Sequence, residues 1–486
     1  MRENIKEEIS KNLDENVSYL KFILKDASDI VFREFHIGDF KTELIYIDGM
    51  ANRDLINDFI LKSFMYKGDS VKNTNEIKNN ILTVSDLIEV ESMRKGIDSM
   101  LSGDTLLFLQ GFPKCYVVAT RLWPARGVAE PSGETAIRGG RDGFTETIRF
   151  NTALIRRRIR DTRLKIVSQN LGVRSKTDVV VVYIEDIVNK EVLKELNSRL
   201  EKINIDAILD SGYVEHLIED SSTSLFPQIQ STERPDVVAA SLYEGRIAIL
   251  VDNSPFVIIV PAILPNFFQS PDDYYQRWMY SSTVRIVRVI SLFITLILPA
   301  SYVAVTSFHS SIIPTKLAYF IAASREGVPF PAYVETIIME ISLAFLMESI
   351  VRLPKPISST VGIVGGLIIG QAAVSAGIAS PIMIIIVSVT AITSFTVPNY
   401  DIALAFRIIR FFLIILSSFL GLYGIVLGLI IVLVHLSKLK SFGVPYLSPI
   451  VSLHTKDFKD MFIRLPIKYF KERPNYMKTE DKIRQK

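Results

Sequence analysis

Hydrophobic residues are distributed unevenly along this chain of 486 residues. Between Met1 and Arg285, no stretch is apolar over the roughly 20 residues that a helix needs to cross a bilayer. From Val289 to Leu436, long apolar runs follow one another. This division predicts a multi-domain membrane protein, in which a large water-soluble domain precedes a multi-span transmembrane domain. We therefore expect the protein to act at a membrane.

The charged residues and the cysteine content limit the partners and the compartment. The formal net charge is only +3 and no basic stripe carries interleaved aromatics, so no nucleic acid is predicted as a partner. Cys115 is the only cysteine, which rules out an internal disulfide and suits a reducing compartment. The charged start lacks the apolar core of a secretory signal. Arg277, Arg285 and Arg288 precede the first apolar run, and positive residues there tend to stay inside. We therefore expect a cytoplasmic N-terminal domain.

The soluble half alternates between the patterns of helices and strands. Apolar residues at helical spacing predict helices over Ile5–Leu24, Asn52–Phe64 and Lys190–Ile203. Short strands are predicted at Ile30–Ile37, Glu43–Ile47, Thr105–Gln110, Cys115–Thr120, Asp178–Tyr183, Arg246–Val251 and Phe256–Val260. The polar stretch Lys67–Asn80 is typical of a boundary. These patterns predict a mixed α/β domain with two subdomains, residues 1–80 and 81–271.

A glycine- and arginine-rich loop is the first conspicuous motif. Paired glycines beside arginines could cradle a phosphate, but no Lys-Ser/Thr follows them and no strand precedes them in phosphate-loop register. We therefore favour a structural or interaction loop over a nucleotide site. The basic helix that follows is predicted to turn Arg156, Arg157, Arg158 and Arg160 toward solvent, lipid headgroups or a partner. The motif residues of the loop are Glu130, Gly133, Glu134, Gly140, Arg141, Asp142 and Gly143.

A second motif region contains several acids that helix and turn geometry can explain. Thr232 can cap a helix and Pro235 suits its first turn, while Gly245 suits its end. Asp252 to Pro255 is typical of a turn between two strands. The acids could bind a cation or act as acid and base, but no paired histidine accompanies them, so we favour a structural role and predict no catalytic residue, metal or cofactor. The motif residues are Glu233, Arg234, Pro235, Asp236, Glu244, Gly245, Arg246, Asp252 and Pro255.

The transmembrane domain is predicted over residues 272–436, and a basic tail over residues 437–486. The lysines and arginines of the tail indicate a cytoplasmic C-terminus, which demands an even number of crossings. Five apolar runs are present, near residues 289–308, 332–349, 361–379, 381–397 and 411–436. One run should therefore be re-entrant, interfacial or buried. The run at 332–349 is the first candidate because it carries Glu335, Glu340 and Glu348.

These three carboxylates and one glycine face are the candidate functional features of the membrane half. Charged residues within a span are costly and usually face protein or water. Helical geometry puts Glu340 and Glu348 broadly on one side and Glu335 away from them. Either the three residues line a cation path or bind a partner, or the segment lies at the interface and its carboxylates reach water. Gly362, Gly366 and Gly370 form a smooth face for packing within the subunit or for subunit assembly.

The ordered set of motifs resembles the A subunits of GerA-type spore germinant receptors. The similarity runs from about Ile81 to the end of the chain. It implies a cytoplasmic α/β domain, a multi-span domain in the spore inner membrane and cytoplasmic ends. It also implies a transporter-like B subunit and a lipoprotein C subunit as partners, homo-oligomers, and a nutrient-gated ion channel that triggers germination. A stage V sporulation protein of the same family shares the motifs and is the alternative. The matching segments are Glu130–Glu134, Gly140–Phe144, Phe226–Ile229, Thr232–Asp236, Glu244–Arg246, Asp252–Pro255, Pro354–Pro356 and Val397–Pro398.

Two other classes of function compete with a receptor or channel subunit. A secondary transporter would need repeats and broken helices at the midplane, and the apolar runs show no internal repeat. A membrane-tethered enzyme would need convergent catalytic groups in the soluble half, and none of the motifs reaches that quality. We therefore expect a protein that is not an enzyme and that contacts membrane lipids and partner subunits.

Overall fold

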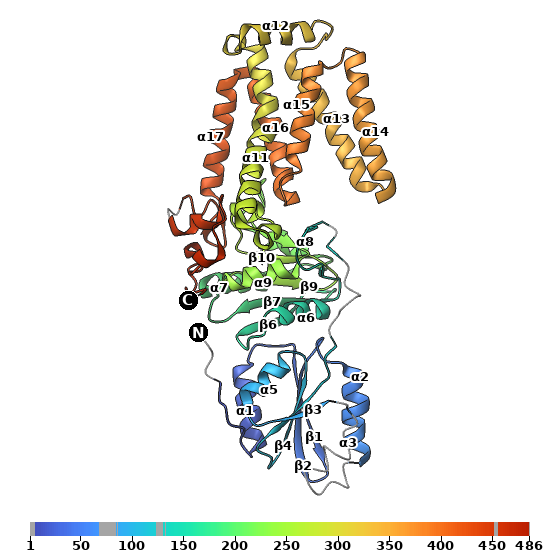
Figure 1. Ribbon diagram of the computed structural model, residues 1–486, viewed down its shortest axis with the longest axis vertical. Coiled ribbons are helices and arrows are strands. Elements are labelled where there is room, and N and C mark those ends of the chain that lie inside the picture. The colour runs from blue at the N-terminus through green and yellow to red at the C-terminus, as the bar shows by residue number, and fades with distance from the viewer. Residues whose placement is uncertain are drawn as a thin grey trace.

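The computed structural model describes residues 5–67, 84, 86–122, 130–131, 133–451 and 455–485. It consists of two α/β units stacked below a helical bundle, with both marked chain ends beside the α/β units (Figure 1). Apart from Lys67, the predicted boundary stretch Lys67–Asn80 lies outside the described residues.

The first α/β unit is an antiparallel sheet with the strand order β1-β2-β4-β5-β3. Alternating side chains bury both faces of the sheet. On one face Ile45 packs against α1 and α5, and on the other face Leu44 packs against the helical segment α2–η1–α3. The expected boundary between residues 80 and 81 falls within this sheet, because β4, which follows the boundary, pairs with β2, which precedes it. The elements are α1 (Leu13–Ile23), β1 (Ile30–Ile37), β2 (Phe40–Ile47), α2 (Arg53–Leu55), η1 (Ile56–Leu61), α3 (Lys62–Lys67), β3 (Leu87–Val90), α5 (Met93–Met100), β4 (Thr105–Leu109) and β5 (Cys115–Val118).

The second α/β unit is another antiparallel sheet, with the order β6-β7-β9-β10-β8. Helices α6 and α9 cover one face and α7 and α8 the other, so the apolar run Val179–Val182 is buried from both sides. The elements are α6 (Ile148–Arg158), β6 (Leu164–Leu171), β7 (Thr177–Ile184), α7 (Lys190–Glu201), α8 (Ser211–Ile218), β8 (Gln230–Thr232), α9 (Pro235–Tyr243), β9 (Ile247–Val251) and β10 (Val257–Val260).

A buried ion pair joins the two α/β units and corrects the prediction for the basic helix. Arg156 is completely buried, and its Nε and Nη2 donate to the two carboxylate oxygens of Asp29 at 2.9 and 2.8 Å. Beside it, Ser28 N–H donates to the carbonyl of Ile166 at 2.9 Å. Arg158 also points inward, toward Asp142. Arg156 and Arg158 therefore pair with acids of the α/β domain, whereas Arg157 and Arg160 are exposed, as predicted.

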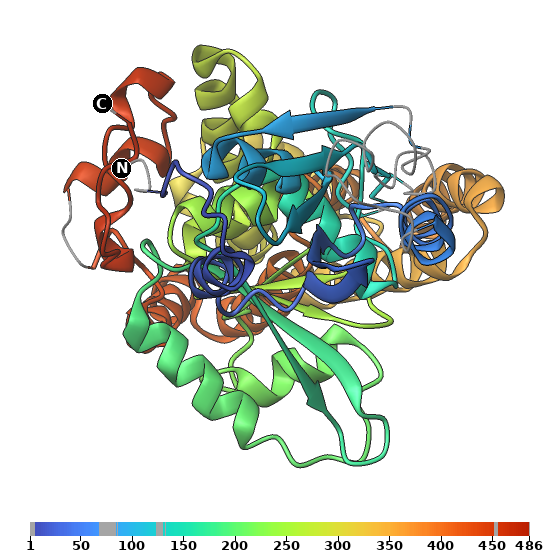
Figure 2. The same ribbon diagram turned by 90° about the horizontal axis from the view of Figure 1, so that it is seen from below.

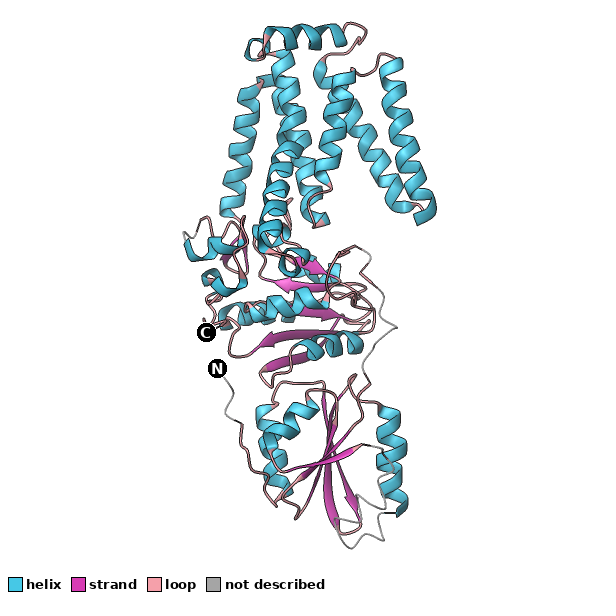
Figure 3. Cartoon of the chain, in the orientation of Figure 1, coloured by secondary structure: helices cyan, strands magenta, loops and turns pink. Residues whose placement is uncertain are grey.

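Residues 278–438 form a helical bundle of six long helices that run alternately up and down, with α12 lying across the far end (Figures 1 and 3). Two of them, α11 and α16, are long and apolar enough to cross a bilayer, judged by length and composition. The elements are α11 (Trp278–Ser307), η5 (Ser310–Ile312), α12 (Thr315–Ser324), α13 (Ala332–Arg352), α14 (Lys355–Ser375), α15 (Pro381–Ser394), α16 (Tyr400–Leu420) and α17 (Leu422–Lys438).

The last apolar run differs from its prediction as a single span. It divides at Gly421, whose φ of +60° ends α16 and starts α17. A Cβ atom at this position would lie 2.6 Å from Cε1 of His309, so the turn requires glycine. The division gives an even number of long helices, and the run at residues 332–349, the first candidate for a re-entrant or interfacial segment, forms the regular helix α13.

The linker and the tail connect these parts. The linker between β10 and α11 contains η4 (Leu264–Phe267) and α10 (Asp272–Tyr275). After α17 come β11 (Lys440–Ser441), β12 (Val444–Pro445), η6 (Thr455–Asp460), η7 (Ile467–Tyr469) and η8 (Asn475–Met477). We call residues 455–485 the C-terminal segment. It packs against the second α/β unit, since Arg473 Nε donates to the carbonyl of Tyr243 at 2.8 Å. In the view from below, the segment lies at one side of the molecule (Figure 2).

Candidate functional site

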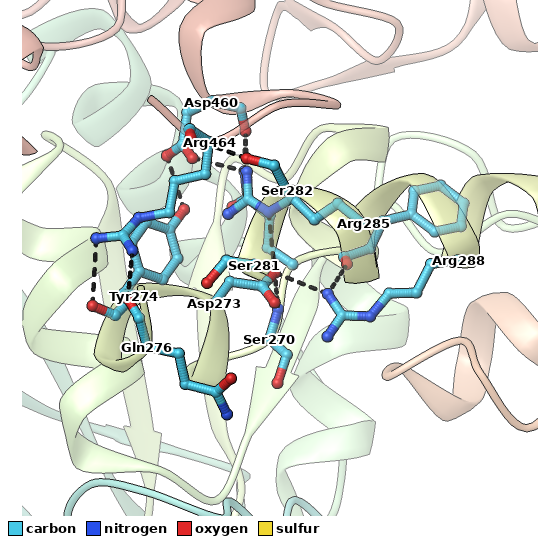
Figure 4. Close-up of polar contacts among 12 residues, drawn as sticks. Ser270, Asp273, Tyr274, Gln276, Ser281, Ser282, Arg285, Arg288, Asp460 and Arg464 are labelled. Carbon is cyan, nitrogen blue, oxygen red and sulfur yellow. Dashed lines mark hydrogen bonds and ion pairs between the residues drawn. The ribbon is translucent and has the colours of Figure 1, made fainter. Parts of the chain in front are cut away.

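A buried polar junction lies where the second α/β unit meets the base of α11 (Figure 4). Its central group is Asp273, whose Oδ2 accepts hydrogen bonds from Arg285 Nε at 2.9 Å and Arg288 Nη1 at 2.7 Å. The two arginines are three residues apart, so they share one face of α11. The side chain of Asp273 is only 2% exposed. One carboxylate therefore holds two buried cations at the start of this helix.

The C-terminal segment completes the junction from the other side. Asp460 accepts from Arg285 Nη1 at 2.7 Å and from the Tyr274 hydroxyl at 2.7 Å. Arg464 donates to the carbonyls of Gln276 and Tyr274 at 3.0 and 3.2 Å. Burial raises the pKa of Tyr274 well above its usual value, so the hydroxyl keeps its proton and remains a donor. Arg285 thus lies between acids from two segments far apart in the sequence.

The single helical turn α10 makes a different contact with each of its residues. Asp272 accepts from the backbone N–H groups of Ile137 and Arg138 at 3.2 and 3.1 Å. Asp273 binds α11 and Tyr274 binds Asp460, as described above. Tyr275 donates its hydroxyl proton to Asp236 Oδ2 at 2.6 Å. The turn therefore links the motif loop, α11, the C-terminal segment and α9.

The structure brings the two motif regions of the sequence together around Arg234. This residue is buried, and its Nη1 and Nη2 donate to the carbonyls of Glu134 and Gly140 at 3.2 and 3.0 Å. Its Nε and Nη2 also bind Asp236 at 3.0 and 2.7 Å. In addition, Gly133 N–H donates to Glu233 Oε2 at 3.2 Å. Arg234 therefore anchors the motif loop to the start of α9, where Pro235 occupies the first turn.

Further motif residues of the loop have contacts within the domain. Burial would raise the pKa of Asp142, but the hydrogen bonds and charge of Arg158 lower it. Arg141 pairs with Glu130 at 3.2 Å on the surface, and Gly143 precedes Phe144, whose N–H donates to the carbonyl of Glu233 at 2.8 Å. Arg141, beside the paired glycines, and Arg158 thus already have acidic partners, which disfavours a phosphate cradle here.

The remaining motif residues shape the second sheet and its connections. Gly245 has a φ of +90° and lies close to Thr479 of the C-terminal segment. Asp252 Oδ1 accepts from Ile148 N–H at 3.1 Å at the start of α6, and the turn that it opens runs through Pro255 into β10. The buried Arg246 donates to neutral acceptors. Glu244, in contrast, lies beside Arg484 at 3.9 Å.

The three carboxylates of α13 differ in burial and in their partners. Glu335 is buried and accepts from the N–H and hydroxyl of Ser380, both at 2.6 Å. Glu340 is also buried, and pairs with Arg410 of α16 at 2.7 Å. Glu348 is exposed and pairs with Arg352. Although Glu335 and Glu340 point to different sides of α13, both are buried because α13 has neighbours on both sides. Glu340 and Glu348 lie broadly on one side of this regular helix, but only Glu340 is enclosed by protein.

The glycine face of α14 packs within the chain. A Cβ atom on Gly362 would lie 3.2 Å from Ile350 of α13, and one on Gly366 would lie 4.0 Å from Leu346 of α13. Gly370 faces Ile384 of α15 at 3.6 Å. In this arrangement the glycines let neighbouring helices approach each other.

Comparison with known proteins agrees with these motifs. A family model described as Bacillus/Clostridium GerA spore germination protein matches residues 18–476. The chain belongs to the GerA family. The predicted resemblance is therefore confirmed.

Several GerA-family relatives are similar over almost their whole length. The chain is 44% identical to the uncharacterized membrane protein YfkQ of Bacillus subtilis (strain 168), over 96% of this chain and 91% of YfkQ. It is 43% identical to spore germination protein KA of the same organism, over 98% and 89%. It is 40% identical to spore germination protein GerLA of Bacillus cereus, over 98% and 97%. A solved structure, the N-terminal domain of the A subunit of the Bacillus megaterium spore germinant receptor GerK3, matches with 36% identity and a TM-score of 0.43, over 54% of this chain and 99% of that one.

Sequence reasoning missed the junction of this GerA-family protein. Arg285 and Arg288 served only as indicators of topology, and the partners Asp273 and Asp460 were not singled out. The available signal was the acidic and aromatic tetrapeptide Asp272–Tyr275. It stands shortly before the first long apolar run, whose start carries Arg285 and Arg288. Within the described part of the chain, no group of three or more potential metal ligands occurs.

Proposed function

We propose that this protein is the membrane-embedded A subunit of a nutrient germinant receptor, which is not an enzyme. In this role it passes a nutrient signal between its α/β domain and its helices and, as an oligomer, encloses an ion path. The names of the relatives support the proposal, since proteins 43% and 40% identical over nearly the whole chain are spore germination proteins. We further propose that a transporter-like B subunit and a lipoprotein C subunit are its partners.

The surface of the helical bundle supports a place in a membrane, which we propose is the spore inner membrane. Large apolar side chains point outward from separate helices, among them Ile363 (73% exposed) and Leu367 (67%) of α14 and Phe419 (75%) of α16. Such contiguous apolar surface is unfavourable in water and favourable in lipid. The even number of helices supports placing both the α/β domain and the C-terminal segment on the cytoplasmic side.

The polar junction is the observation that carries the proposed relay. Arg285 sits on α11 while its two acids belong to the linker and to the C-terminal segment. A displacement of the α/β domain would separate at least one of these buried pairs unless α11 moved with it. Because an unpaired buried charge is costly, the two parts should move together.

The buried acids limit how an ion path can form. Glu335 and Glu340 each have an arginine within one chain, at 3.4 Å from Arg325 and 2.7 Å from Arg410. We propose that the path opens between subunits, with Glu348 available on the surface of α13. We further propose that Glu340 contributes only when its pair with Arg410 separates.

Reconstitution into planar bilayers tests the proposal. The protein together with the B and C subunits should conduct ions when nutrient is added, and spores lacking it should fail to germinate with that nutrient. Glu340→Gln and Glu348→Gln should change conductance or selectivity, while Glu201→Gln, an exposed acid of α7, serves as the control. A complex that stays non-conducting with nutrient counts against the channel, and unchanged conductance in both variants removes these residues from the path.

Further measurements separate the alternative functions. Nutrient uptake by the protein alone would favour a secondary transporter, and nucleotide or phosphate-ester turnover would favour an enzyme. Normal nutrient germination combined with defective spore formation would place the protein with the stage V sporulation branch. Genes for a transporter-like protein and a lipoprotein beside this one would support the receptor.

A further inference from the structure

A cavity of about 280 Å³ lies between the second α/β unit, the linker and the C-terminal segment. Arg246 from the start of β9, Tyr274 from α10, and Arg464 and Arg484 from the C-terminal segment all line it. Its walls thus come from three parts of the chain that the junction also connects. The ion pairs of Asp273 lie elsewhere, so the cavity is not accounted for by the junction.

Arg246 is the unusual residue of this cavity. It is only 3% exposed, and it donates to the carbonyl of Pro261 at 2.8 Å, to Gln230 Oε1 at 2.8 Å and to Ser241 Oγ at 3.2 Å. All three acceptors are neutral. Its buried Nη2 has no acceptor among the described residues. A buried guanidinium that has only neutral hydrogen-bond acceptors and one unsatisfied N–H group is costly, so an anion from outside the chain would relieve a cost that the fold otherwise carries.

The C-terminal segment brings two more guanidinium groups to the same space. Arg464 is buried, and its Nε has no acceptor among the described residues. Arg484 approaches an acid only at 3.9 Å, where it faces Glu244. Burial raises the pKa of Glu244, which weakens it as a counter-ion. The cavity wall also contains two other carboxylates, Glu134 and Asp236, which already accept hydrogen bonds from Thr232 and Arg234. The unpaired N–H donors of Arg246 and Arg464 are therefore not satisfied by these acids.

We propose that this cavity binds a small oxyanion, a carboxylate or a phosphate, with Arg246 as the buried anchor. Arg464 and Arg484 complete its shell, and the rings of Tyr274 and Phe470 form the apolar wall. Guanidinium groups suit this task because their N–H donors match two oxygens at once. The volume is close to the lower limit of ligand pockets, about 300 Å³, and so fits a small molecule.

The position of the cavity gives the ligand a regulatory consequence. A bound oxyanion would hold the C-terminal segment against the second α/β unit, because Arg246 and Arg484 would bind the same molecule. Arg464 also donates to the carbonyls of Gln276 and Tyr274, directly before α11. Occupancy would thus stabilise the junction in the arrangement described here. This inference goes beyond the proposed function, and binding can be measured without conductance.

Titration of the full-length protein in detergent tests the proposal. Inorganic phosphate and acetate are added separately at constant ionic strength, with sodium chloride as the reference. We expect a saturable rise in Tm and calorimetric binding with at least one of them. Arg484→Gln and Ala240→Leu, which fills the cavity from the exposed side of α9, should each weaken binding at least tenfold. Arg174→Gln, an exposed arginine paired with Asp206, is the matched control and should bind as wild type.

Each outcome decides the question. Phosphate binding identifies a phosphate site, and acetate binding a carboxylate site. Saturable binding that both cavity variants leave unchanged would place the anion elsewhere and overturn the proposal, as would the absence of saturable binding to either anion. Arg246→Gln, which removes the anchor, should also weaken binding. If this variant does not fold, Arg484→Gln and Ala240→Leu still decide. A negative result leaves the conductance experiment untouched, so failure of this site and failure of the channel are distinguishable.

Discussion

Replacing Asp273 by alanine should loosen the base of α11 more than any single surface change. The substitution removes the carboxylate shared by Arg285 and Arg288, both of which are buried. Arg285 keeps Asp460 at 2.7 Å, whereas Arg288 keeps only the carbonyl of Phe268 at 3.1 Å. One buried cation is therefore left without an acid.

The expected loss of stability follows from the number of buried cations that are left without an acid. Removing one partner of a buried ion pair costs about 3–5 kcal/mol, because the remaining charge stays buried. Two independent pairs would cost about twice as much, but Asp460 compensates Arg285, so we expect the single value. Asp273→Asn keeps an acceptor oxygen and should cost about 1–3 kcal/mol, the range for one imperfect buried hydrogen bond.

Hydrogen exchange of amides in the first turns of α11 measures the effect in the full-length protein. A loss of about 3–5 kcal/mol corresponds to exchange roughly 10²–10⁴ times faster, if exchange reports local opening. Asp206→Ala is the control because its pair with Arg174 is 68% and 82% exposed, and such pairs contribute about 0–1 kcal/mol. Exchange in Asp273→Ala within tenfold of wild type would refute the reasoning that the junction is stabilised by this carboxylate.

Three further predictions concern single side chains. Burial raises the pKa of Glu134 to about 7, so the folded state disfavours its ionised form; the penalty is absent below pH 4.5 and complete above pH 7. Glu134→Gln should therefore raise Tm at pH 8, by the equivalent of about 1–3 kcal/mol, and leave Tm unchanged at pH 4.5; an equal gain at both would contradict this. Gly421→Ala should lower stability by about 1–3 kcal/mol or more, whereas Gly443→Ala, also at positive φ but in open space, should cost less in the same thermal scan; equal losses would exclude a role for the clash with His309. Burial raises the pKa of the Cys115 thiol to about 12, so maleimide should label it only after denaturation, and rapid labelling of the native protein would show that the first sheet opens.

Local patterns predicted much of the α/β architecture. The strand at Ile30–Ile37 has the bounds that alternation indicated, and α7 begins at Lys190 as its apolar spacing predicted. The boundary between subdomains was wrong because β4 pairs with β2 across roughly 60 residues of sequence, and no local signal carries that pairing. A polar stretch marks a loop, whether that loop joins two domains or two strands of one sheet.

The candidate site was less accessible to sequence reasoning than the fold. The sequence predicted Arg156 as a solvent-facing residue of a basic helix. It is buried, and its acidic partner Asp29 lies 127 residues earlier in the chain. The same holds for Asp460, which reaches Arg285 from 175 residues away. Acids and arginines are numerous in this chain, so their types do not reveal which of them pair. The division of the last apolar run was visible in principle, since Gly421 lies within it.

The four residues of α10 tie the α/β domain to the base of the helical bundle. A flexible linker would let the two halves move independently, but each residue of this turn is attached to a different part: Asp272 to the motif loop, Asp273 to α11, Tyr274 to the C-terminal segment and Tyr275 to α9. A turn this short cannot rotate to keep one contact without straining the others. Any change in the motif loop that moves Asp272 must therefore reach Asp273 within a single peptide unit. The motifs of the α/β domain and the charged start of α11 are then connected through α10. The abrupt change in hydrophobicity along the sequence lies at this connection.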